Sequence, residues 1–70
     1  MSKIRYGRLN QPCYFGMYWP KAQRNTLVQI VPASNLPVVN QAFLVYFHHG
    51  VQHSVLLKDA DINRIVDFRT

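Results

Sequence analysis

Residues 41–57 read QAFLVYFHHGVQHSVLL, two runs of strand-forming residues separated by His49-Gly50. Glycine readily supplies the positive φ of a tight turn, so the runs 41–48 and 51–57 predict a β-hairpin. From Phe43 to Phe47 every residue is apolar, which places apolar side chains on both faces of the first strand. We therefore expect both faces of this strand to be covered.

The rest of the chain also favours strands, because β-branched and aromatic residues are common and Glu is absent. We predict strands at 3–9, 13–19 and 26–31, a polar turn at 21–25 and a loop at 33–41. A helical or 3₁₀ turn is expected at 58–62, with Asp59 as N-cap. Residues 63–68 fit either helical spacing or a last strand, and the strand is preferred. The predicted fold is mainly β: a small antiparallel sheet or partly open SH3-like or OB-like barrel, with a short helical turn near the C-terminus.

Length and composition limit the class of protein. Seventy residues form one domain, 1–70, with a small core. The single cysteine excludes an internal disulfide and is typical of a reducing, cytoplasmic protein. We expect no secretory signal and no membrane partner, because no apolar run approaches the ~20 residues that span a bilayer.

The positive charge is concentrated in the first third of the chain. Eight Lys and Arg face three Asp, giving a net charge of +5 and a pI near 9.9. No Asp, Glu, Lys or Arg occurs from 25 to 57. A local positive field attracts polyanions, and nucleic acid is the commonest one in a cytoplasm. The alternative is a solvated basic face that only confers solubility. The basic residues of the first third are Lys3, Arg5, Arg8, Lys21 and Arg24.

Aromatic residues between these basic residues suggest how bases would be held. On a strand at 13–19, Tyr14, Gly16 and Tyr18 would share one face, and the residues Cys13, Phe15, Met17 and Trp19 would face the core. Two tyrosine rings beside a glycine would leave a flat floor for stacking nucleobases, as in proteins that bind single strands. Amphipathic packing of the tyrosines, or a protein interface, is the alternative.

The sequence offers little for catalysis or metal binding. The three Asp lie beside Lys and Arg, and the glycines are spread singly, so we expect no enzyme and no cofactor. We expect Cys13 to be a buried structural thiol. His48 and His53 would be diagonal neighbours on one hairpin face, with His49 or Cys13 as further metal ligands. No Cys-x-x-Cys spacing supports such a site, so we predict none.

Three functions are compatible with these patterns. The preferred hypothesis is a nucleic-acid-binding domain, with single strands as the expected ligand. The second is a protein-interaction module: a small regulatory or inhibitory protein, of the sort carried by phages and other mobile genetic elements, docked on a larger complex. The third is a structural subunit that only forms homo-oligomers. Because a small domain struggles to cover both faces of one strand, we expect a homo-oligomer, most simply a dimer. The alternative is a self-closing barrel in which Tyr46 turns its hydroxyl to solvent.

Overall fold

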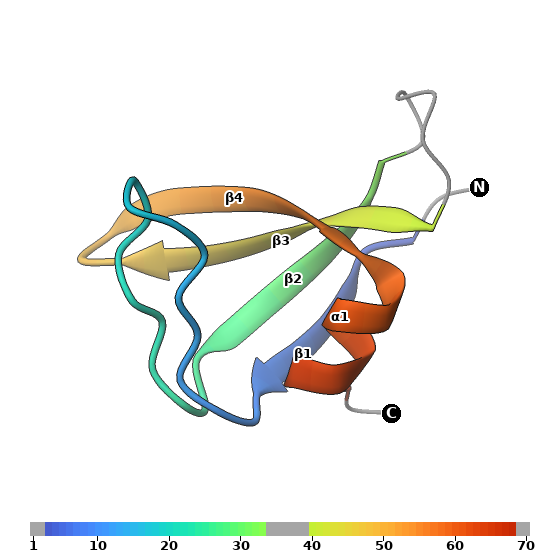
Figure 1. Cartoon of the computed structure of the whole chain (residues 1–70), viewed down its shortest axis with the longest axis horizontal. Helices are drawn as coiled ribbons and strands as arrows, with labels where there is room; N and C mark the ends of the chain where they lie inside the picture. Colours follow the sequence, from blue (N-terminus) through green and yellow to red (C-terminus); the bar gives the residue numbers. More distant parts are fainter. Residues whose placement is uncertain (1–2, 34–39, 69–70) are drawn as a thin grey trace.

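The chain forms a single antiparallel sheet with one short helix, in a computed structural model that describes residues 3–33 and 40–68. The strands occur in the sheet in the order β4-β3-β2-β1-β5, so the last strand returns beside the first (Figure 1). The prediction of a small, mainly β domain with a helical segment near the C-terminus is confirmed. The elements are β1 (Arg5–Leu9), β2 (Leu27–Pro32), β3 (Gln41–His48), β4 (Val51–Lys58), α1 (Asp59–Ile65) and β5 (Val66–Phe68).

The β3–β4 hairpin has the predicted turn. His49 and Gly50 both have positive φ, 53° and 78°, and they separate the cross-strand pair His48 and Val51. Positive φ at both central residues matches the right-handed twist of the strands, which makes this two-residue turn favourable. The pairing continues without interruption to Gln41 and Lys58. Local turn chemistry therefore fixes the register of the two longest strands.

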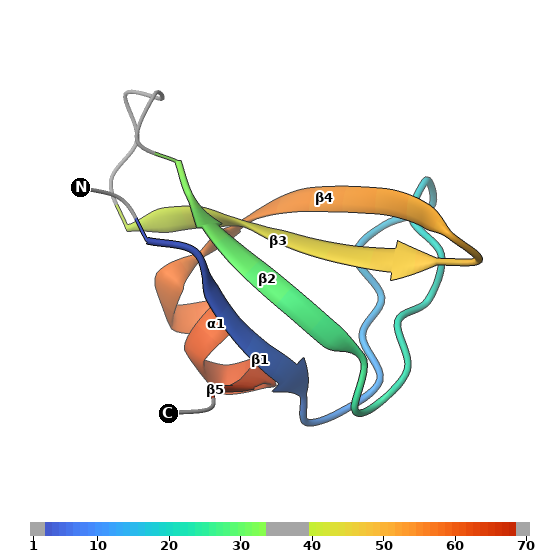
Figure 2. The same cartoon turned by 180° about the vertical axis from the view of Figure 1, so that it is seen from behind.

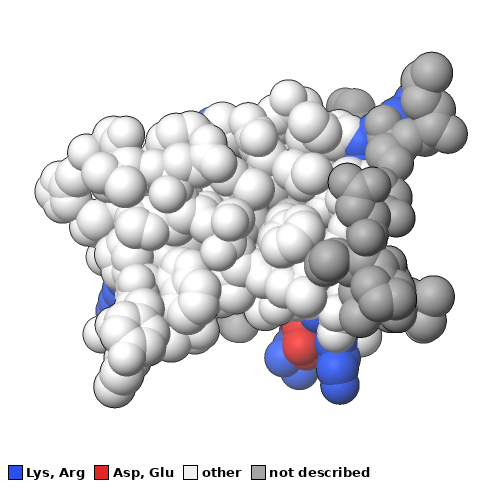
Figure 3. All heavy atoms as spheres, turned by 90° about the horizontal axis from the view of Figure 1, so that it is seen from above, with Lys and Arg blue, Asp and Glu red and all other residues white. Residues whose placement is uncertain are grey.

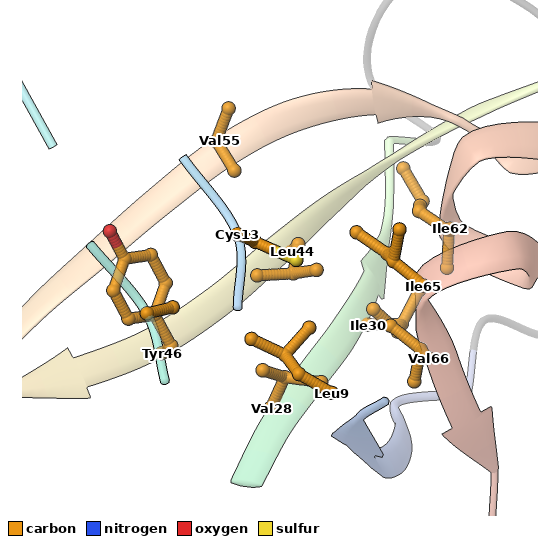
Figure 4. Packing of buried hydrophobic residues seen from close by; sticks show 12 residues of the cluster. Leu9, Cys13, Val28, Ile30, Leu44, Tyr46, Val55, Ile62, Ile65 and Val66 are labelled. Atoms are coloured by element: carbon orange, nitrogen blue, oxygen red, sulfur yellow. The ribbon is translucent and has the colours of Figure 1, made fainter. Parts of the chain in front are cut away.

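The sheet has an inner face that carries the core and an outer face that does not. Leu44 and Tyr46 of β3 point inward beside Val28, and all three are at most 1 % exposed. Figure 4 shows these side chains converging with Ile62 of α1 and Leu9 of β1. Phe43, Val45 and Phe47 alternate with them and point outward. The prediction that β3 is apolar on both faces is therefore realised in the geometry.

A long connection between β1 and β2, residues 10–26, covers the inner face together with α1. Both lie in front of the sheet in Figure 1 and behind it in Figure 2. The Tyr46 hydroxyl donates to the Pro20 carbonyl oxygen at 2.7 Å, and the Trp19 indole N–H donates to the Ser54 carbonyl oxygen at 3.0 Å. Two hydrogen bonds thus hold the tip of the connection to the hairpin, one from the buried Tyr46 and one to the edge strand β4. The alternative in which Tyr46 exposes its hydroxyl is wrong, since this residue is 1 % exposed.

The predicted strand at 13–19 is not formed. Only Cys13 makes a ladder contact, an isolated bridge to Ala22, and the chain then reverses in a turn closed by a bond from Trp19 N–H to Gly16 O. Gly16 has φ of 148°, which lies outside the range that L-residues readily adopt. The reversal rotates Met17 outward, where it is 85 % exposed instead of in the core.

The C-terminal segment contains a longer helix than expected. It spans Asp59–Ile65, with Lys58 at the N-cap position, so Asp59 is the first helical residue and not the cap. Ile62 and Ile65 are buried, which explains the helical spacing in the sequence. The predicted last strand follows as β5. Most of the predicted loop at 33–41 lies outside the described residues.

Strand β5 approaches β1 closely at Gly7. A Cβ atom there would lie 2.6 Å from both the Asp67 carbonyl oxygen and Val66 Cγ1. Glycine is therefore required by proximity at this position and not by an unusual φ. Among the described residues, no helix is long and apolar enough to span a membrane.

Candidate nucleic-acid interface

All five predicted basic residues are exposed, but they do not form one surface. Arg5 and Arg8 lie on β1, and their side chains point to opposite faces of the sheet. The Arg5 guanidinium stacks on the Phe68 ring, 4.2 Å from its centroid, on the β5 side. Arg8 lies on the outer face. Lys3 precedes β1, and Lys21 lies on the returning arm of the 10–26 connection, beside the Cys13–Ala22 bridge.

Arg8 and Arg24 are brought to the same end of β1. Arg8 Nη1 donates to the Asn25 carbonyl oxygen at 2.9 Å, and Asn25 N–H in turn bonds to Leu9 O at 2.8 Å. These contacts fix the chain beside Arg24 against the end of the strand. One guanidinium nitrogen of Arg8 is thereby anchored, while the remaining N–H groups stay available to a ligand.

Tyr6, Gly7, Arg8 and Leu27 line an open pocket of about 330 Å³ on the outer face of β1. We call it the β1 pocket. Tyr6 and Arg8 stand on the same side of the strand, two residues apart, and Leu27 is the cross-strand partner of Arg8. Tyr6 is 52 % exposed and Leu27 is 54 % exposed. The pocket therefore combines an accessible aromatic ring, an arginine and an aliphatic wall.

Acidic groups lie near this pocket without neutralising Arg8. Asp67 is the partner of Arg8 on the β5 side, but its Oδ1 accepts a hydrogen bond from Asn10 Nδ2 at 3.4 Å. In the part of the chain that the structure describes, the one ion pair joins Arg64 and Asp61 at 3.1 Å. Arg8 therefore makes no ion pair within the described residues, although the carboxylate of Asp67 across from it lowers the local positive potential.

The predicted stacking residues Tyr14 and Tyr18 are both accessible, but they do not form the expected flat floor. They are 76 % and 83 % exposed, Tyr14 on the outgoing arm of the connection and Tyr18 in the turn at its tip. Tyr14 lines a second pocket, of about 260 Å³, with Gln11 and the paired Asp61 and Arg64. The carboxylate of Asp61 offsets the charge of Arg64, which makes this pocket less suited to an anion.

The histidines and the cysteine do not converge. His53 packs on the Tyr46 ring and His48 on the His49 ring, with centroids 5.5 Å and 4.2 Å apart. Cys13, on the outgoing arm of the connection, is buried in the core as predicted, and burial raises its thiol pKa. Residues 3–33 and 40–68 contain no group of three or more His, Cys, Asp or Glu side chains placed to hold a metal ion.

Sequence reasoning missed Tyr6 as a site residue. The signal was present, because Tyr6 and Arg8 have the period of two that places residues on one face of a strand. The aromatic-rich segment 13–19 drew the prediction instead, since its tyrosines were assigned to a strand that does not form. Leu27 begins an apolar run, and such a run predicts buried side chains, so nothing in the sequence indicates that Leu27 is exposed.

Comparisons with known proteins assign no family to the chain. No protein-family model matches it, and no curated protein or solved structure gives a match. The chemistry of the exposed residues is therefore the basis for a functional proposal.

Proposed function

We propose that the protein binds single-stranded nucleic acid, with the β1 pocket as the place where a base is held. The observation that supports this most directly is the pairing of an exposed aromatic ring and an exposed guanidinium group, Tyr6 and Arg8, on one face of β1, where Arg8 uses one nitrogen to bond the Asn25 carbonyl oxygen. Unstacked bases bind between such groups because every base has a π-face.

The spacing of the two side chains suits a planar ring. Same-face neighbours on a strand stand about 6.6 Å apart, which is close to twice the ~3.5 Å contact distance between carbon atoms. A base can therefore lie between Tyr6 and the Arg8 guanidinium, with Leu27 at its edge. The backbone of Gly7 between them forms part of the pocket lining.

The remaining basic residues would contact phosphates on either side of that base. Lys3 lies before the start of β1 and Arg24 lies beside its end, so positive charge flanks the pocket along the strand. Such contacts carry no sequence information but strengthen binding at low salt. The proposal therefore predicts sequence-tolerant binding with a marked salt dependence.

The decisive experiment is fluorescence anisotropy with labelled single-stranded and double-stranded oligonucleotides, at low salt and at about 0.15 M ionic strength. Tyr6→Ala should weaken single-strand binding by about 5-fold to 150-fold, since base stacking contributes ~1–3 kcal/mol. Arg8→Lys keeps the charge but removes the planar guanidinium, so it should also weaken binding at both salt concentrations.

Two matched variants separate the pocket from general charge and from the loop tyrosines. Lys58→Gln removes one positive charge at the far end of β4 and should change affinity only slightly. Tyr18→Ala removes a more accessible ring outside the pocket, 83 % exposed against 52 % for Tyr6. Absence of binding at physiological salt, or a Tyr6→Ala variant that binds as tightly as the wild type, would reject the proposal.

A protein-interaction module is the second candidate, favoured by the apolar tip of the molecule. Met17, Tyr18 and Val51 are 85 %, 83 % and 57 % exposed, and the two turns that carry them lie at the same end of the sheet (Figure 1). Exposed aromatic and Met side chains are enriched at protein interfaces. If oligonucleotides fail to bind, affinity capture with wild-type protein and a Tyr18→Ala control becomes the next test.

A further inference from the structure

We infer that the outer side of the β3–β4 hairpin binds a second copy of this chain. The surface concerned, the outer β3–β4 face, consists of three apolar side chains on β3 and three uncharged ones on β4. It shares no residue with the β1 pocket, whose Leu27 lies on the neighbouring strand β2, and the inference does not depend on the proposed nucleic-acid binding. Its residues are Phe43, Val45, Phe47, Gln52, Ser54 and Leu56.

This face is apolar and lacks charge. Phe47 is 55 % exposed and Leu56 is 38 % exposed, whereas Val45 between them is already buried at 8 % and Phe43 is half-buried. The helix α1 and the 10–26 connection lie on the opposite side of the sheet (Figure 2). Seen from above, along the side of the molecule where β4 lies, few charged side chains are visible, and these lie at the margins of the view (Figure 3). Covering such side chains stabilises a complex by about 25 cal/mol per Å² of apolar area removed from water.

The polar members of the face favour a second copy over a charged partner. Gln52 and Ser54 lie opposite Phe47 and Val45 on the hairpin, and both are exposed. An amide and a hydroxyl each carry donors and acceptors, so each can bond its own copy across a two-fold axis. A strongly acidic or basic partner would lose water from its charges on this face without gaining an ion pair.

The distribution of charge also favours a second copy of the chain as the partner. Two chains that each carry a net charge of +5 repel one another, and the repulsion is least when their uncharged faces meet. The basic residues of β1 and of the 10–26 connection then lie away from the contact. Salt should strengthen this association, because it screens the repulsion, and should weaken nucleic-acid binding.

The edge of β4 is a less favourable place for self-association. The Trp19 indole donates to the Ser54 carbonyl oxygen, a backbone group on that open edge. Covering an edge in this way hinders the addition of another strand. Face-to-face contact therefore remains as the geometry for a dimer.

The size of the face predicts a weak dimer. Strands of eight residues span about 26 Å, and the two strands β3 and β4 about 10 Å, which gives a projected area of about 250 Å². Stable complexes bury roughly 600–1,000 Å² per partner. We therefore expect a dissociation constant on the order of 10–100 µM.

Sedimentation velocity of the full chain without oligonucleotide, from about 1 µM to about 1 mM, tests the inference. The mass should rise from 8.2 kDa towards that of a dimer, and more so at higher salt. Phe47→Gln should weaken association at least tenfold. Met17→Gln changes an even more exposed apolar residue outside the face, and should leave association unchanged.

A wild-type chain that remains monomeric overturns the inference, as does a Phe47→Gln variant that associates like the wild type or a Met17→Gln variant that is equally impaired. Amide chemical shifts on dilution provide a second measurement that needs no substitution. Concentration-dependent shifts should occur at Gln52, Ser54 and Leu56. Shifts confined to β1 or to residues 10–26 would show a different interface and contradict the inference.

Discussion

The inner and outer faces of the sheet are made of the same strands but differ in how completely their side chains are buried. On the inner face, Leu44 and Tyr46 are enclosed by α1 and by the 10–26 connection, and the Tyr46 hydroxyl has a backbone acceptor. On the outer face, Tyr6 and Phe47 remain more than half exposed. The inner face thus accounts for the stability of the domain, and the outer face offers surface for binding.

The largest expected effect is loss of packing on the inner face. Leu44 is fully buried, so Leu44→Ala should reduce the free energy of unfolding by about 2–5 kcal/mol. For a domain of this size that is a large share of the total stability. Leu27→Ala, at a residue 54 % exposed on the outer face, should cost less than about 1 kcal/mol. Urea unfolding at low protein concentration compares the two, and equal losses would remove the distinction between the faces.

The junction of β1 and β5 tests how tightly the inner side is packed. Gly7→Ala should cost about 1–3 kcal/mol, because the new methyl group meets the backbone of Asp67 and the side chain of Val66. At Gly50 nothing lies within 4 Å of an added Cβ, and only its φ of 78° disfavours other residues. Since Asn tolerates positive φ, Gly50→Asn should be milder than Gly7→Asn in thermal unfolding. The reverse order would contradict the close approach of β5.

The Tyr46 hydroxyl allows a pH test. Burial raises the pKa of this phenol above its usual value of 10.0, so the folded state favours the protonated form. Its contribution is therefore complete below pH 10 and is lost as the pH rises through the higher folded-state pKa. Tyr46→Phe should cost about 1 kcal/mol at neutral pH and should flatten the alkaline fall in stability. Tyr18→Phe, at an exposed position, serves as the control, and an unchanged alkaline profile in Tyr46→Phe would contradict the assignment.

An effect on stability as small as that of Tyr46→Phe is expected at the edge of β4. Trp19→Phe keeps an aromatic ring but removes the donor to Ser54 O, which should cost about 0.5–1.5 kcal/mol. The freed edge should also promote open-ended association at high concentration, unlike the two-fold dimer of the wild type. Light scattering over time measures this, and a variant with unchanged association would show that Trp19 does not protect the edge.

The hairpin and the last strand could be predicted because their signals are local. Gly50 follows His49 between two apolar runs, and Val66 to Phe68 alternates with the period of a strand. The 10–26 connection could not be predicted, because its course depends on a hydrogen bond that Trp19 donates and one that Pro20 accepts, each with a partner more than 20 positions away. The same difficulty affected the site: Arg8 was identified from its charge, but Tyr6 gained its role only when Leu27 was placed opposite Arg8.

The pairing of β1 with β5 has a consequence for the order in which the chain folds during synthesis. Leu9 is made early, and its partner Val66 emerges only after the rest of the sheet. Until then β1 has a free edge on that side, and Gly7 lacks its close contact with β5. Non-local pairings of this kind slow folding and expose unpaired backbone. The β2–β4 meander is therefore expected to form first on the ribosome, with β1 secured last.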